Sequence, residues 1–182
     1  AGVADGLPAT ERQRLIDRLV VAYGARLQVR DEIEKLRNAP PENASLQAWL
    51  SEFAGPPPYS ALRVDGLRDQ FDATRERLQS LASAERALES QKTALLETQR
   101  RAGEGVRLAD DRLARARTAP EVDKERLNRE LSSLRLKLAE AELTTIGLAV
   151  DRLQLETKLL QTLSGEMQRL LARVLPEQRL TK

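Results

Sequence analysis

A regular hydrophobic repeat begins in residues 64–96, VDGLRDQFDATRERLQSLASAERALESQKTALL. From Val64 to Ala116, positions spaced alternately three and four residues apart are mostly apolar, and this spacing is typical of a coiled-coil seam. Twelve of the sixteen are apolar. The sixteen positions are Val64, Leu67, Phe71, Thr74, Leu78, Leu81, Glu85, Leu88, Lys92, Leu95, Gln99, Ala102, Val106, Ala109, Leu113 and Ala116. The pattern predicts one long amphipathic helix.

A second long helix is expected directly after it. Thr118 and Glu121 have the spacing of a capping box, and Pro120 falls in the first turn, where proline is tolerated. The segment that follows has two apolar stripes. The first stripe is Leu136, Leu143, Ile146, Val150, Leu153, Leu160, Met167, Leu171 and Val174. The second stripe is Leu127, Leu131, Leu134, Leu138, Ala141, Leu148, Leu155 and Leu159.

The short turn near residue 119 predicts that the two long helices are antiparallel neighbours. If residue i faces residue 238 − i, the seam of the first helix meets the first stripe of the second. Leu95 then faces Leu143, and Leu78 faces Leu160. The second stripe needs another partner. An N-terminal helix is the expected one, which gives a three-helix bundle over part of the length.

The complete expectation is an all-α fold in a single elongated domain over residues 1–182. Helices are expected at about 9–37, 45–54, 60–117 and 120–175, with prolines between the first three. The first helix is expected to bury one face, and Thr10 and Ser45 are the expected caps of the first two helices. That face is Leu15, Leu19, Tyr23, Leu27, Ile33 and Leu36. The ends of the sequence suggest a fragment of a longer membrane protein.

Composition argues against several classes of function. The sequence has no Cys and no His, so most nucleophilic, acid–base and metal-binding arrangements cannot be built, and neither an enzyme nor a cofactor site is expected. Thirty basic and 28 acidic residues are interspersed, which predicts no nucleic-acid partner. No concave site for a small-molecule substrate is expected. No run of about 20 apolar residues is present, so any membrane contact is expected through segments outside this chain.

Two groups of residues are candidate sites. Trp49, Phe53 and Tyr59 flank Pro56–Pro58 and are the candidate structural anchor. The polar seam residues are the second group, as candidate positions for fixing the register or binding a partner. They are Glu85, Lys92 and Gln99. Solvated long side chains that reach out of the seam are the simpler interpretation.

One stretch resembles a known family. Residues 49–60, WLSEFAGPPPYS, followed by VDGLRD at 64–69, are similar to the periplasmic N-terminal region of large bacterial mechanosensitive channels of the small-conductance family. The resemblance implies a non-catalytic extracytoplasmic domain of an ion channel, periplasmic and attached to the inner membrane. It would act as a spacer or interaction module that modulates the channel. Its partners would be proteins or other subunits of the same protein.

Two alternatives stay open. One is a periplasmic helical-hairpin adaptor, although no strand pattern flanks the hairpin as lipoyl-like domains would require. The other is a coiled-coil scaffold or chaperone, for which a cytoplasmic location is the alternative expectation. The polar tip, Arg115–Lys124, does not offer the apolar surface that a holdase would need.

Overall fold

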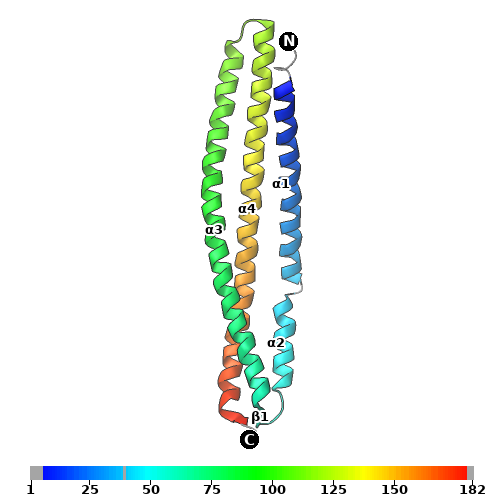
Figure 1. The fold of residues 1–182 in the computed structure, drawn as a ribbon, viewed down its shortest axis with the longest axis vertical. Helices are drawn as coiled ribbons and strands as arrows, with labels where there is room; N and C mark the ends of the chain where they lie inside the picture. The colour runs from blue at the N-terminus through cyan, green and yellow to red at the C-terminus, as the bar shows by residue number, and fades with distance from the viewer. Residues whose placement is uncertain (1–5, 39, 180–182) are drawn as a thin grey trace. The chain divides into compact units, whose positions relative to one another are not determined.

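The computed structural model describes residues 6–38 and 40–179, and nearly all of them are helical (Figure 1). The elements are α1 (Gly6–Asn38), α2 (Pro41–Glu52), β1 (Tyr59–Ser60), α3 (Ala61–Arg115), α4 (Ala119–Val174), the 3-10 turn η1 (Leu175–Glu177) and β2 (Gln178–Arg179). Helices α3 and α4 pack against each other, so the predicted all-α hairpin is confirmed.

The chain divides into two compact units, and each long helix contributes to both. Unit 1 is residues 1–30 with 88–150, and unit 2 is residues 31–87 with 151–182. Unit 1 therefore contains the first part of α1, the second part of α3 and the first part of α4. Unit 2 contains the end of α1, all of α2, the first part of α3 and the end of α4.

In unit 1, Figure 1 shows α4 between α3 and α1. Asp110 on α3 accepts a hydrogen bond from Arg129 on α4 at 2.5 Å, close to the turn that joins them. Their residue numbers add to 239, close to the predicted 238. On the other side of α4, six side chains form one apolar core. They are Leu15, Leu19 and Ala22 of α1 and Leu131, Leu138 and Ala141 of α4.

Helix α1 runs parallel to α4, and ion pairs border their shared core. Arg12 pairs with Glu130 at 2.6 Å and Arg18 pairs with Glu142 at 2.8 Å, so residue numbers rise together along the two helices. The predicted pairing of the N-terminal helix with the second stripe of α4 is therefore confirmed in this unit.

In unit 2, the α3–α4 seam closes around five fully buried side chains. They are Phe53, Val64, Leu67, Met167 and Val174. Thr74 is also buried, and its hydroxyl lies 4.0 Å from the sulfur of Met167. The two-residue strands β1 and β2 pair in parallel, with Tyr59 beside Gln178 and Ser60 beside Arg179. This short pairing was not predicted.

The predicted buried face of α1 is partly wrong, because Tyr23 and Leu27 are 50% and 63% exposed. Position 22 is buried instead, and Thr145 of α4 donates a hydrogen bond to the Ala22 carbonyl at 3.3 Å. A small side chain there lets α1 approach α4 closely. Position 26 carries a partly buried arginine, whose aliphatic stem can pack while its charged end stays in water. The inward positions are Leu15, Leu19, Ala22, Arg26, Val29, Ile33 and Leu36.

Two helix starts also differ from the prediction. Helix α1 begins at Gly6, so Thr10 lies within the helix. Helix α2 begins at Pro41, four residues before Ser45. In both cases a proline lies in the first turn, where its missing N–H removes a donor that has no partner within the helix. The prolines therefore begin these helices instead of only separating them.

Candidate interaction surfaces

The turn between α3 and α4 is fixed by the predicted capping pair. The Glu121 carboxylate accepts backbone N–H bonds from Arg117 and Thr118, each at 3.2 Å. These bonds, the Arg117 bond foremost, hold the pKa of Glu121 below its ordinary value, because they stabilise the charged form. The acid also lies at the positive end of the α4 dipole. The predicted start of the second long helix is thus supported by its own side chain.

The three aromatic residues of the candidate anchor lie together in unit 2. The rings of Trp49 and Phe53 are stacked with centroids 6.1 Å apart, and Tyr59 meets Phe53 edge-on at 5.4 Å. Phe53 is buried, whereas Trp49 and Tyr59 are partly exposed. The Tyr59 hydroxyl donates to the Gly55 carbonyl at 3.1 Å, which bridges the proline-rich corner. Such ring pairs add stabilisation beyond the area that they bury.

Contacts to both long helices hold this corner in place. A Cβ on Gly66 of α3 would lie 3.3 Å from Cη2 of Trp49, so the indole rests against the helix backbone. From α4, Arg173 donates to the carbonyl of Phe53 at 3.2 Å. Arg63 pairs with Glu52 at 3.2 Å. Helix α2 and the corner that follows it are therefore held against α3 and α4 by ring packing and by two arginines.

The three polar seam residues make separate local contacts. Glu85 accepts a hydrogen bond from Gln154 on α4 at 2.9 Å, within unit 2. Lys92 pairs with Glu89 on its own helix at 3.4 Å, within unit 1. Gln99 is partly exposed. Of these three residues, Glu85 alone forms a hydrogen bond to the facing helix. It is therefore the one whose contact can help to fix the register of α3 against α4.

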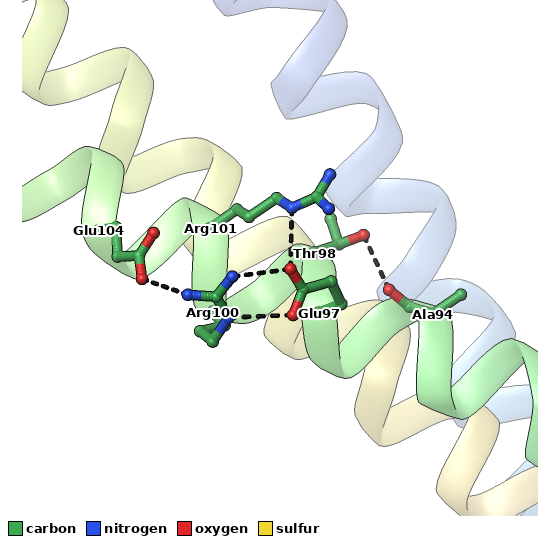
Figure 2. A network of polar contacts seen from close by, with 6 residues as sticks. All are labelled: Ala94, Glu97, Thr98, Arg100, Arg101 and Glu104. Atoms are coloured by element: carbon green, nitrogen blue, oxygen red, sulfur yellow. Dashed lines mark hydrogen bonds and ion pairs between the residues drawn. The ribbon is translucent and has the colours of Figure 1, made fainter.

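A charged cluster lies on α3 in unit 1 (Figure 2). Both carboxylate oxygens of Glu97 accept bonds from Arg100, at 2.8 and 2.9 Å, and Arg101 adds a third at 3.0 Å. The bonds from Arg100 and then Arg101 lower the pKa of Glu97 to about 2. Arg100 also pairs with Glu104. The cluster fixes Arg101 at the border of a hollow that α1 and α4 also line.

Sequence reasoning missed a buried carboxylate in unit 2. Glu156 on α4 is 8% exposed and accepts two bonds from Arg77 on α3, at 2.7 and 3.1 Å. Arg152 lies 3.4 Å from the same carboxylate and 2.8 Å from Glu32 on α1. The network connects three helices. The seam pattern gave no sign of it, because the alternation of three and four after Val150 and Leu153 leads to Thr157 and leaves Glu156 beside the seam position.

Sequence reasoning also missed an apolar groove in unit 1. Its cavity has a volume of about 470 Å³ and lies between α1 and α3, with α4 as its floor. The lining residues of this apolar groove are Asp17, Arg18, Val21, Ala22, Ala25, Leu95, Glu142, Thr145 and Ile146. Val21 is 72% exposed at its edge. The sequence shows neither this edge nor the space between α1 and α3.

Two further hollows continue the apolar groove along α4. The next hollow shares Arg18 and Glu142 with the groove, and the last one is lined by Arg14 of α1 and Arg112 of α3. Among the ion pairs of the described residues, none involves Arg14 or Arg112. We call these three hollows together the unit 1 trough. It is apolar at one end and basic at the other.

Within residues 6–38 and 40–179, no helix is long and apolar enough to cross a membrane. The same residues contain no cluster of three or more acidic side chains that could hold a metal ion. No protein-family model, no curated protein and no solved structure is significantly similar to the chain. The resemblance to mechanosensitive channels therefore stays a prediction.

Proposed function

We propose that the chain is a non-catalytic interaction module, whose unit 1 trough accepts an amphipathic helix from a protein partner. The observation that carries the proposal is the apolar groove between α1 and α3. A helix laid in such a groove inserts side chains at positions i, i+3 or i+4 and i+7. Bundles of this kind commonly build their binding sites between facing helices.

The charges of the trough define the partner's chemistry. A docked helix would place apolar side chains over Val21, Leu95 and Ile146. Towards the other end it would meet the guanidinium groups of Arg14 and Arg112, which line the hollow there. Carboxylates are the matching groups, because they form charge-assisted hydrogen bonds with arginine. The expected partner is a helix with an apolar stripe and acidic residues on one half.

The setting that we propose follows from the resemblance of residues 49–69. In that setting the chain is the extracytoplasmic part of a mechanosensitive channel in the periplasm. The docked helix then belongs to another subunit or to an envelope protein, and the module modulates gating as a spacer or lever. The scaffold alternative differs only in the setting, because it would use the same trough in a protein that carries no current.

A synthetic helix tests the docking proposal directly. A labelled peptide with leucines at i, i+3 and i+7 and glutamates on its second half should bind the full chain, as measured by fluorescence anisotropy. The same peptide with lysines in place of the glutamates should bind at least tenfold more weakly. Val21→Glu should abolish binding because it places a charge at the groove. Equal affinity for both peptides, or no binding up to about 1 mM, would contradict the proposal.

The channel setting needs a separate experiment on the full-length gene product. Stretch-activated conductance in membrane patches should persist when residues 1–182 are deleted, with an altered threshold or altered kinetics. A full-length protein that gives no stretch-activated current and fractionates with the cytoplasm would exclude the channel. The scaffold alternative would then take its place, and the docking result would be unaffected.

A further inference from the structure

Helix α1 carries a second apolar stripe, most of which the described elements of unit 1 leave exposed. Its residues are Ile16, Val20, Tyr23 and Leu27, and we call them the outer seam. Val20, Tyr23 and Leu27 are 66%, 50% and 63% exposed. Spacings of four, three and four residues are those of a coiled-coil seam. The apolar groove lies on another side of α1, where its lining includes Val21 and Ala25.

The outer seam is separated from the face that packs on α4. With about 100° per residue, its centre lies about 100° around α1 from the line through Leu19 and Ala22. Gly24 flanks the seam on the side away from that line, and a Cβ on Gly24 would meet nothing within 4 Å. This small residue allows another helix to approach closely, as Ala22 does where α1 meets α4. A surface of this kind fits a helix better than a flat partner.

The seam matches itself when two copies run antiparallel. Spacings of four, three and four read the same in both directions, so Ile16 faces Leu27 of the second copy and Val20 faces Tyr23. Arg30 then faces the uncharged Gln13 of the second copy at either end of the seam. We infer that the outer seam is a self-association surface, which pairs two copies of this chain about a two-fold axis.

The size of the seam sets the strength of this dimer. The four side chains expose an apolar patch on the order of 400 Å², which is within the range that marks interaction sites on monomers. Stable interfaces bury about 800 Å² on each partner, so this patch supplies about half of that area. The dimer is therefore weak and reversible, with a dissociation constant of about 10 µM to 1 mM. The inference is independent of the docking proposal, because the trough stays open in monomer and dimer alike.

Two exposed valines offer a matched pair for the test. Val20 lies in the outer seam and Val21 lies at the apolar groove, and both are mostly exposed, so glutamate at either position should leave the fold intact. In sedimentation equilibrium of the full chain, the wild type and Val21→Glu should dimerise with the same affinity. Val20→Glu should weaken the dimer at least tenfold. A wild type that stays monomeric to about 1 mM, or a dimer weakened by Val21→Glu and not by Val20→Glu, overturns the inference.

The orientation has its own test, since the natural sequence has no cysteine. When Val20→Cys and Tyr23→Cys proteins are mixed and oxidised, the mixed disulfide should exceed either symmetric disulfide. Two fully exposed cysteines on separate surfaces would form the three species near their random proportions. Random proportions, or a dominant symmetric Val20→Cys product as in a parallel pair, would overturn the antiparallel arrangement.

Discussion

Glu156 shows how much a single charge can matter within an apolar seam. Its side chain is nearly buried and lies between Arg77 and Arg152. Glu156→Gln should lower the free energy of unfolding by about 1–3 kcal/mol, because Arg77 loses its counter-charge and Arg152 keeps only Glu32. The half-exposed Arg77 keeps the cost below that of a fully buried pair. Urea unfolding followed by circular dichroism measures this change in the free energy of unfolding. The exposed pair Glu166–Arg169 is the control. Glu166→Gln should cost less than about 0.5 kcal/mol, and equal costs would contradict the structure.

The pKa of Glu97 gives a prediction with a definite pH range. Hydrogen bonds from Arg100 and then Arg101 lower it from 4.5 to about 2. A lowered folded-state pKa means that the stabilisation is present above about pH 4.5 and is lost as the pH falls towards 2. Carboxyl ¹³C NMR should show Glu97 titrating near pH 2, and Arg100→Gln should move this midpoint upward. A wild-type midpoint at 4.5 would show that the cluster does not form in solution.

Glycines within α3 separate the effect of backbone entropy from that of packing. Gly103 has no neighbour within 4 Å of an added Cβ, whereas a Cβ on Gly66 would lie 3.3 Å from Trp49. Gly103→Ala should therefore raise the free energy of unfolding by about 0.5–1 kcal/mol. Gly66→Ala should raise the free energy of unfolding by less, or lower it, because the indole of Trp49 must move. Thermal unfolding of both variants measures the difference. The same gain at both positions would show that Trp49 does not rest on α3.

The helices differ in how far their packing could be read from sequence. The alternation of three and four predicted fifteen inward positions in α3 and one, Ala116, directly after it, and all of them are buried or partly buried. This helix has a single apolar stripe, so the pattern has one solution. Helix α1 has two apolar stripes, and sequence does not say which one meets α4. The prediction included Tyr23 and Leu27 because their side chains are large and apolar, and the structure uses the stripe with Ala22 and Val29 instead.

The candidate surfaces were harder to predict than the helices. The aromatic group around Phe53 follows from residues close in sequence, bracketed by prolines, and its rings lie together. The apolar groove depends on three helices whose lateral spacing no local pattern encodes. Glu156 was overlooked because it lies one residue before the seam position at Thr157, and a buried charge was not expected there. Local patterns thus predict faces, while hollows between faces need the structure.

At the scale of the whole molecule, both units use the same hairpin. In unit 1 the pair Asp110–Arg129 adds to 239, and in unit 2 the pair Glu85–Gln154 adds to the same number. The pair Arg77–Glu156 adds to 233, which its long side chains can span. A shared register means that α3 and α4 need no insertion or skipped turn between the two units. The regular spacing of the seam through residues 85–92 is consistent with this.

A shared register predicts which engineered disulfides will form. Leu95 and Leu143 face each other in unit 1 by the predicted register, and Leu78 and Leu160 do so in unit 2. Cysteine pairs at both places should oxidise within the chain, because facing seam residues bring their Cα atoms near the range that a disulfide spans. Each cross-link should raise the free energy of unfolding by about 4 kcal/mol through loop-closure entropy. Cysteines at 95 and 131 are the mismatched control. Oxidation of that control at the same rate would show that the hairpin register is wrong, and oxidation at 95 and 143 alone would show that the register changes between the units.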